Sequence, residues 1–171
     1  KYFLPVVITI VFVIFFSQLL KKDVTKLSSQ LIEKPVPTFN MPTLLNDNQS
    51  FSTIDVITSD IALVNIWSSW CIPCRSEHEI LMLLSKIEGI DLYGINYKDK
   101  EDNALDFINE LGNPFKKIGV DTNGRSSMVW GVYGIPETFI IHKGTVIYKH
   151  IGPIHMNELE GIILPILGDI L

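Results

Sequence analysis

Both cysteines of this 171-residue chain lie in one C-x-x-C motif, Trp70-Cys71-Ile72-Pro73-Cys74. A nearly continuous apolar run, residues 61–67, precedes the motif, and a helical pattern, residues 72–87, follows it. This is the setting of a redox dithiol, because the unpaired N–H groups at a helix start stabilise a thiolate. The pattern predicts Cys71 as the attacking sulfur at the exposed start of the helix. Cys74, one turn in and shielded, is predicted to resolve the mixed disulfide.

Other uses of a cysteine pair fit this sequence less well. A zinc site needs about four ligands, and the histidines show no paired spacing: His78, His142, His150 and His155. Attachment of a c-type haem needs a histidine directly after the second cysteine, where this chain has Arg75. We therefore expect no metal and no cofactor. Two structural cysteines that happen to lie three residues apart are the ordinary alternative.

A proline stands before a second apolar strand, in Gly134-Ile135-Pro136-Glu137-Thr138. An X-Pro bond in the cis form costs only about 0.5–1 kcal/mol, and it would open the adjoining backbone to a substrate chain. A trans proline in an ordinary loop is more frequent. The residues alone therefore leave the isomer open.

The N-terminal segment holds nearly all of the apolar excess behind the mean hydropathy of +0.28. Residues 2–20 carry no charge, and as a helix they would span roughly 28 Å, enough to cross a bilayer core. No A-x-A-like site follows, so we expect an uncleaved anchor over residues 1–21 rather than a cleaved signal peptide. The lysines that follow, taken alone, would keep the rest of the chain inside the cell.

The remainder divides into a polar linker, residues 22–36, and one α/β domain, residues 37–171. A hairpin-like start is expected over residues 39–45 and near Phe51. Strands are expected over residues 61–67, 90–96, 117–120, 138–142 and 145–150, and helices over residues 72–87, 101–111, 126–130 and 155–171. Pro165 should kink or stop the last helix. This order predicts a mixed sheet with helices on both faces. The net charge of −5 argues against a nucleic-acid partner.

From about Pro37 onward, the chain resembles the thioredoxin superfamily, most strongly in VNIWSSWCIPC and GIPETFII. The segments WSSWCIPCRSEH, GINYKDKEDNALDFINELGNPF and GVYGIPETFIIHKGTVIYKHIG look most like the membrane-anchored thioredoxins of cytochrome c maturation, the CcmG/DsbE family. The resemblance implies a thioredoxin fold preceded by one transmembrane helix, with the domain on the periplasmic side of the inner membrane. It also implies that the chain reduces the disulfide of apocytochrome c, with electrons from a membrane thiol reductase. It favours a cis Pro136.

The resemblance further implies roles for side chains near the dithiol. Asn65 stands where many thioredoxins place a buried aspartate. Glu77 would tune the cysteines or relay a proton, as the family's matching acidic residue is thought to do; its ordinary alternative is a solvated surface carboxylate. Glu137 matches a position that lines the site, and its alternative is a turn residue. Trp70, beside Cys71, is expected both to pack and to contact the partner.

Other residues near the motif are expected to have structural roles. Trp67 and Pro73 should pack, Arg75 should reach solvent, and His78 should lie on the helix surface.

Several functions remain open at this point. The substrate is apocytochrome c or another C-x-x-C thiol protein, or the chain is a general outer-face thiol reductase. A thiol peroxidase relative is disfavoured, because Cys74 follows Cys71 so closely. A non-catalytic chaperone or metal carrier tethered to the membrane is the alternative from another class. Because disulfides form in oxidising compartments, we expect the domain to face the periplasm despite the lysines.

Overall fold

The computed structural model describes residues 8, 12–13, 15–17, 30–45 and 49–171. Most of the predicted anchor, residues 1–21, and the first part of the predicted linker, residues 22–29, lie outside these ranges. Among the residues that are described, no helix combines the length and the apolar character that a membrane crossing requires. The anchor therefore stays a prediction.

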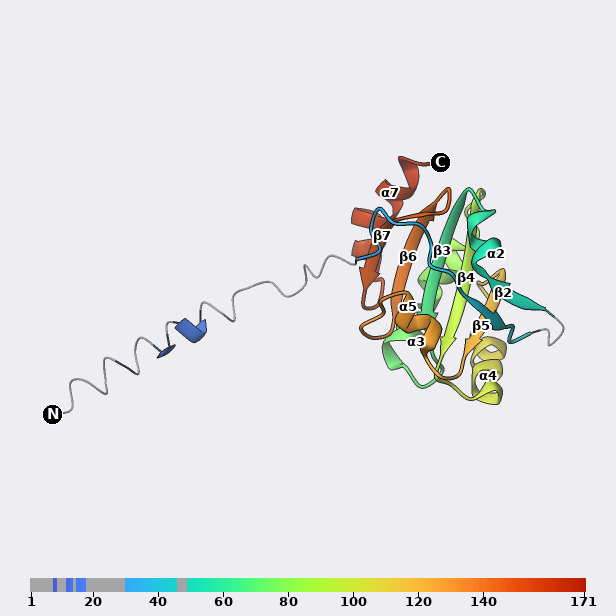
Figure 1. The fold of residues 1–171 in the computed structure, drawn as a ribbon, viewed down its shortest axis with the longest axis horizontal. Coiled ribbons are helices and arrows are strands. Elements are labelled where there is room, and N and C mark those ends of the chain that lie inside the picture. Colours follow the sequence, from blue (N-terminus) through green and yellow to red (C-terminus); the bar gives the residue numbers. More distant parts are fainter. Residues whose placement is uncertain (1–7, 9–11, 14, 18–29, 46–48) are drawn as a thin grey trace.

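A five-stranded mixed sheet forms the centre of the domain, in the order β5-β4-β3-β6-β7 (Figure 1). Its strands are β3 (Ile61–Trp67), β4 (Ile90–Tyr97), β5 (Lys117–Asp121), β6 (Glu137–His142) and β7 (Thr145–Ile151). Strand β3 pairs in parallel with β4 and antiparallel with β6. All of its residues are buried, as expected for a strand covered on both faces. The predicted strands and the mixed sheet are confirmed.

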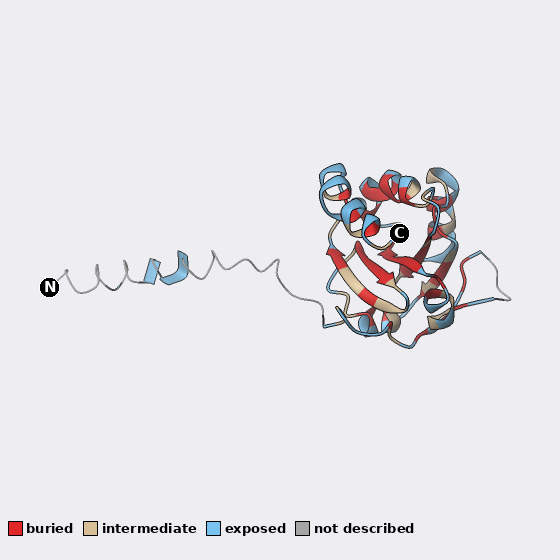
Figure 2. Cartoon of the chain, turned by 90° about the horizontal axis from the view of Figure 1, so that it is seen from above, coloured by how far each residue is buried: buried red, intermediate tan, exposed pale blue. Residues whose placement is uncertain are grey.

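One face of the sheet carries α3 (Ile72–Leu84), α4 (Glu101–Leu111) and the C-terminal helical segment. Helix α3 ends three residues earlier than predicted, because the backbone bonds after Leu84 tighten: Lys86 N–H bonds Leu83 and Ile87 N–H bonds Leu84. Seen from above, the helices turn exposed residues outward around buried strands (Figure 2).

The C-terminal segment consists of α6 (Met156–Glu158), a π-helical turn η2 (Leu159–Ile163) and α7 (Leu164–Gly168). Pro165 does not stop the helix. It lies in the first turn of α7, where its missing N–H is tolerated. The wider π turn lies directly before it, so the irregularity is a change of helix type at Leu164.

The other face carries β1 (Asn40–Pro42), β2 (Ser50–Ser52), α2 (Thr53–Ile57) and α5 (Arg125–Val129). The predicted hairpin-like start is confirmed as the antiparallel pair β1 and β2. Helix α2 was not predicted. Its signal is the Ser-x-x-Asp pattern of a capping box, in which the Asp55 carboxylate accepts from Ser52 N at 2.8 Å.

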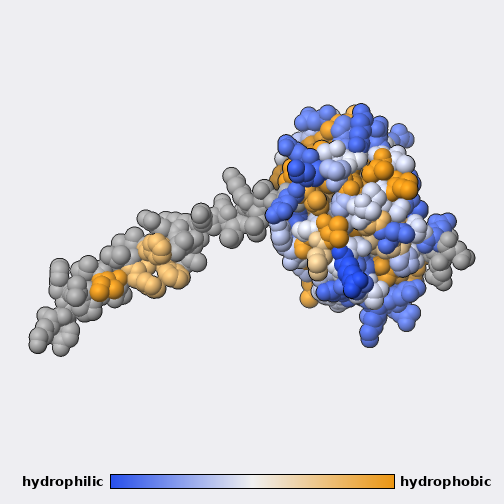
Figure 3. Space-filling model, viewed as in Figure 1, coloured by the Kyte–Doolittle hydropathy of each residue, from blue (hydrophilic) through white to orange (hydrophobic). Residues whose placement is uncertain are grey.

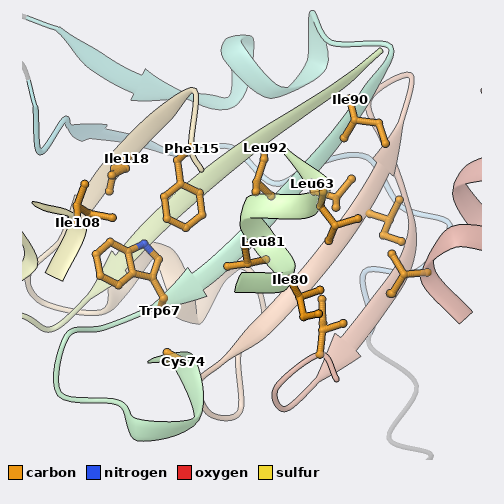
Figure 4. Close-up of a cluster of buried hydrophobic side chains, with 14 of the residues drawn as sticks. Leu63, Trp67, Cys74, Ile80, Leu81, Ile90, Leu92, Ile108, Phe115 and Ile118 are labelled. Carbon is orange, nitrogen blue, oxygen red and sulfur yellow. The ribbon is translucent and has the colours of Figure 1, made fainter. Parts of the chain in front are cut away.

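The core has two parts, one on each side of the sheet. On the side of α3, Leu63 and Trp67 of β3 pack with Leu81 and Phe115, and Cys74 lies at one end of this cluster (Figure 4). On the other side, aromatic rings from β2, from the sheet, from the residue before β1 and from the end of α5 are in contact: Phe39, Phe51, Tyr93, Trp130 and Phe139. The face of the domain seen in Figure 3 mixes apolar and polar residues.

The hairpin packs closely on β5 at Gly119. Leu44 N–H bonds Ile118 at 2.9 Å, and Thr43 bridges Gly119. A Cβ atom at Gly119 would lie 2.7 Å from Cδ1 of Phe51 and would also collide with Met41. Only a residue without a side chain therefore allows the hairpin this close approach.

We predict that Gly119→Ala lowers the free energy of unfolding by about 1–3 kcal/mol through overpacking. Gly168→Ala is the matched control, since a Cβ there meets nothing within 4 Å. Urea unfolding of both variants measures the difference. Equal stability of the two variants would show that the hairpin yields without cost.

Candidate functional site

The two cysteines form a disulfide at the start of α3. Cys71 is the N-cap residue, and its Sγ accepts from Cys74 N at 3.2 Å. Pro73 lies in the first turn, where no N–H is needed. The predicted sequence of strand, turn and helix is confirmed. A thiolate at Cys71 would keep this amide donor and lie at the positive end of the helix.

Cys71 is less accessible than the sequence suggested. In the structure, Cys71 is 4% exposed and Cys74 is 2% exposed. The expectation of an exposed Cys71 is therefore wrong for the disulfide form. Its neighbours Trp70, at 57%, and Ile72, at 83%, are exposed. Pro73 is exposed as well, so the expectation that it packs is wrong. The disulfide thus lies beneath a rim that includes two large apolar side chains.

Below the disulfide, Asn65 joins three elements. Its Nδ2 donates to Oε1 of Glu77 at 2.8 Å and to Oγ1 of Thr138 at 3.0 Å. Oε2 of Glu77 accepts from Ile154 N at 2.9 Å. Asn65 and Glu77 are both fully buried. The alternative of a solvated surface carboxylate at Glu77 is wrong.

Burial raises the pKa of Glu77 to about 7, although the hydrogen bonds from Ile154 and Asn65 act in the opposite direction. The residue lies one helical turn after Cys74, so it faces a similar side of α3. A carboxyl group with this pKa can gain or release a proton near neutral pH, as dithiol exchange requires. Its role as a proton relay stays a prediction.

The Ile135–Pro136 bond is cis, as the resemblance favoured. Pro136 directly precedes β6, and Glu137 pairs in register with Ile66 near the end of β3. The cis bond therefore lies at the same end of the sheet as the carboxyl end of β3, from which the chain continues to Cys71. Pro136 is buried, and its carbonyl accepts from Gly152 N at 2.9 Å.

Glu137 does not line an open surface. The residue is fully buried, and its Oε1 accepts from Tyr133 N at 3.0 Å. Its Oε2 forms an ion pair with Nζ of Lys149 at 2.9 Å, and this Nζ also donates to the Gly131 carbonyl at 2.8 Å. Glu137 therefore fastens the loop before Pro136. Both sequence-based readings, a site-lining residue and a turn residue, are corrected: Glu137 is the first residue of β6.

The remaining predicted residues divide between packing and surface. Trp67 packs between the rings of Phe107 and Phe115, as expected. Arg75 forms an exposed ion pair with Glu110 at 2.8 Å, in agreement with its expected access to solvent.

His78 is not on the helix surface. It is 3% exposed, and its Nε2 bonds the Gly112 carbonyl at 2.9 Å. Its ring also packs against the ring of Phe107 in a T-shaped arrangement, with 82° between the two ring planes. Burial lowers the pKa of His78. Helix α4 and the residues after it cover this side chain, which the pattern of α3 alone did not show.

Two functional neighbours were missed in the sequence. Lys149 is the buried cation beside Glu137, and nothing in the alternation of β7 marks it. Asp99 contacts the turn before the disulfide: its Oδ2 accepts from Ser69 N at 2.6 Å. Its signal is an acidic residue shortly after a buried strand that ends next to the C-x-x-C motif.

Comparisons with known proteins agree with this geometry. The Redoxin family model matches residues 32–163. The thiol:disulfide interchange protein DsbE of Escherichia coli (strain K12) is 42% identical over 146 residues, which cover 84% of this chain and 78% of that protein.

The thiol:disulfide interchange protein CycY of Rhizobium leguminosarum bv. viciae is 47% identical over 109 residues, covering 63% of this chain and 59% of that protein. The crystal structure of a DsbE-like protein from Chlorobium tepidum superimposes with a TM-score of 0.67 at 24% identity, covering 80% of this chain and 96% of that one. This last likeness shows the thioredoxin-like fold.

The raised pKa of Glu77 predicts an unusual pH dependence of stability. The folded chain holds this proton up to about pH 7, whereas the unfolded chain releases it near pH 4.5. Stability should therefore fall as the pH rises between these values, by on the order of 3 kcal/mol. Glu77→Gln should remove this contribution. Urea unfolding of the oxidised chain at pH 4.5 and pH 8 measures it.

Glu79→Gln is the control for this prediction, because Glu79 is an exposed carboxylate on the same helix. It should keep the pH dependence of the unaltered chain. If Glu77→Gln kept it as well, Glu77 would not be the titrating group.

Proposed function

The chain belongs to the Redoxin family and is a thiol:disulfide oxidoreductase related to DsbE and CycY, and from this premise we propose that it reduces the disulfide of apocytochrome c during cytochrome c biogenesis. The observation that carries the proposal is the Cys71–Cys74 disulfide at the start of α3, which lies at the same end of the sheet as the cis Pro136. This arrangement supports a protein substrate. Pro136 itself is buried, but the backbone just before it, at exposed Gly134 and half-buried Ile135, is open to an extended protein segment.

The reaction is an exchange of disulfides. The Cys71 thiolate attacks one sulfur of the partner's disulfide, so a mixed disulfide forms and the partner's other sulfur leaves as a thiolate. Cys74, as its thiolate, then attacks Sγ of Cys71. This step closes the Cys71–Cys74 disulfide and releases the second partner thiolate. Two electrons pass to the partner, and a membrane thiol reductase restores the dithiol by the same steps in reverse.

The surroundings of the disulfide support a protein substrate. Trp70 and Ile72 expose large apolar side chains next to it. Large apolar side chains contribute much of the binding free energy when a protein partner buries them. Glu77 would take up or supply the proton that Cys74 releases or needs. A C-x-x-C segment of apocytochrome c, reduced in this way, has both thiols free for haem attachment.

We place the domain on the periplasmic side of the inner membrane, held by a single anchor over residues 1–21. The uncharged residues 2–20 support the anchor. The dithiol supports the periplasmic location, since a dedicated reductant is needed in the compartment where disulfides form. General reduction of other periplasmic proteins is the second candidate, and a tethered chaperone or metal carrier the third.

Cys74→Ser should trap a mixed disulfide, because the resolving sulfur is gone. Incubation of this variant, in the reduced state, with an oxidised C-x-x-C-H peptide should give a covalent adduct that dithiothreitol releases. Non-reducing electrophoresis and mass spectrometry detect it. Cys71→Ser is the matched control and should give no adduct, because Cys74 is the more shielded sulfur.

The outcomes separate the candidates. An adduct with the cytochrome c peptide that forms no faster than one with unrelated disulfide peptides would favour the general reductase. No adduct with any peptide, together with tight stoichiometric binding of zinc by the reduced chain, would favour the carrier.

A reporter fused after Leu171 should be active outside the cytoplasm. We expect alkaline phosphatase activity from the full-chain fusion, and none when residues 2–20 are deleted. A fluorescent protein that folds only in the cytoplasm provides the reciprocal test. Fluorescence from the full-chain fusion would overturn the placement.

A further inference from the structure

The loop after β4 lies beside the turn that leads to the disulfide. Strands β3 and β4 are parallel, and Trp67 pairs in register with Asn96. The carboxyl ends of the two strands therefore lie at the same end of the sheet, and the segments that follow the strands begin side by side. Residues 98–100 belong to one segment and residues 68–70 to the other.

The Asp99 carboxylate bonds four donors. Its Oδ2 accepts from Ser69 N at 2.6 Å and from Nδ2 of Asn96 at 3.0 Å. Its Oδ1 accepts from Oγ of Ser69 at 2.8 Å and from Lys100 N at 2.9 Å. Two of these four bonds cross to the turn before Cys71. Charge-assisted bonds of this kind are among the stronger ones in proteins.

A third bond joins the same two segments. Nε1 of Trp70 donates to the Lys98 carbonyl at 3.2 Å. Lys98 has a φ of 46°, a conformation that lysine seldom adopts, and its N–H bonds the Asp121 carbonyl at 3.0 Å. The backbone of this loop is thus held in the position from which it meets the indole of Trp70.

A carboxylate suits this place better than an amide. Four donors point at Asp99, and a carboxylate offers two oxygens that only accept. An asparagine would turn one acceptor into a donor and oppose one N–H group. Partial burial alone would raise the pKa of Asp99, but the hydrogen bonds from Ser69 and Asn96 outweigh it and hold the pKa below its usual range. The group therefore stays charged at neutral pH.

The contacts of Asp99 with the turn lie outside the core. Trp70 is exposed, and Ser69 and Asp99 are half-buried. Ordering such a turn when a partner binds costs conformational entropy, and a turn ordered beforehand avoids this cost. What Asp99 fixes is the entry into Cys71: the Cys71 N–H bonds the Ser68 carbonyl at 3.2 Å across this turn.

We propose that Asp99 is a positioning residue for disulfide exchange, which holds residues 68–70 so that Trp70 and Cys71 present one preformed surface to the protein partner. The proposal rests on the proposed function, because it concerns the approach of a protein disulfide to Cys71. Asp99 acts through the turn and touches neither sulfur. Its loss should therefore affect protein substrates more than small ones.

The test compares two substrates with the reduced full chain in detergent. One is an oxidised C-x-x-C-H peptide and the other is the small disulfide 5,5′-dithiobis(2-nitrobenzoate). Asp99→Ala should lower the second-order rate constant of the reaction with the peptide by about tenfold or more, mainly through weaker binding, since both charge-assisted bonds to the turn are lost. The rate with the small disulfide should stay within about twofold. Asp99→Asn should lie between.

Asp102→Ala is the matched control, an exposed acidic residue in the first turn of α4. It should leave both rates unchanged. Ser69→Ala, which removes only the bond between Oγ and Oδ1, should lower the peptide rate severalfold and serves if Asp99→Ala does not fold. Equal losses with both substrates, or no loss with the peptide, would overturn the proposal.

Hydrogen exchange gives a readout that does not depend on the substrate. In NMR spectra of the full chain, the Trp70 Nε1–H and the Ser69 N–H should exchange with solvent at least about tenfold faster in Asp99→Ala. Unchanged exchange would overturn the proposal. If the unaltered chain failed to reduce the peptide, the proposed function would fall, and this exchange measurement would still decide the role of Asp99.

Discussion

The site depends on one buried amide. Nδ2 of Asn65 donates to Glu77 and to Thr138, and so ties the strand before the dithiol to the helix after it and to the strand that follows Pro136. Glu77 extends the connection to Ile154, ahead of the C-terminal helices. Buried polar groups that lose a partner are costly, so none of these elements can shift alone. The same enclosure that fixes the geometry raises the pKa of Glu77.

Two fully buried carboxyl groups, on opposite faces of the sheet, acquire different chemistry from their neighbours. Glu77 has only an amide and a backbone N–H as donors, so burial favours its protonated form. Glu137 faces Lys149, whose Nζ also lies 4.1 Å from the ring centre of Tyr133. One carboxyl group can therefore exchange a proton, and the other fixes the loop that carries the cis proline.

Local pattern was sufficient for the strands, for the setting of Cys71 and Cys74, and for the mixed sheet. It failed where a distant segment decides the environment. His78 repeats the spacing of a surface residue on α3, but α4 covers it. Glu137 reads as a turn or site residue until Lys149, twelve positions later, is seen beside it. Asp99 has no periodic signal, because Ser69, the residue that it holds in the turn, follows a different strand. The isomer of Pro136 came from resemblance, since the residues allowed both.

The cover over the disulfide has a kinetic consequence. With Cys71 and Cys74 only 4% and 2% exposed, a small thiol from solution meets a sulfur that it cannot easily reach, and attack requires access. In the proposed reaction the donor is a protein, and its docking beside Trp70 and Ile72 can supply the binding energy that exposes the disulfide. The proposed protein donor would then reduce the disulfide faster than small thiols in solution can.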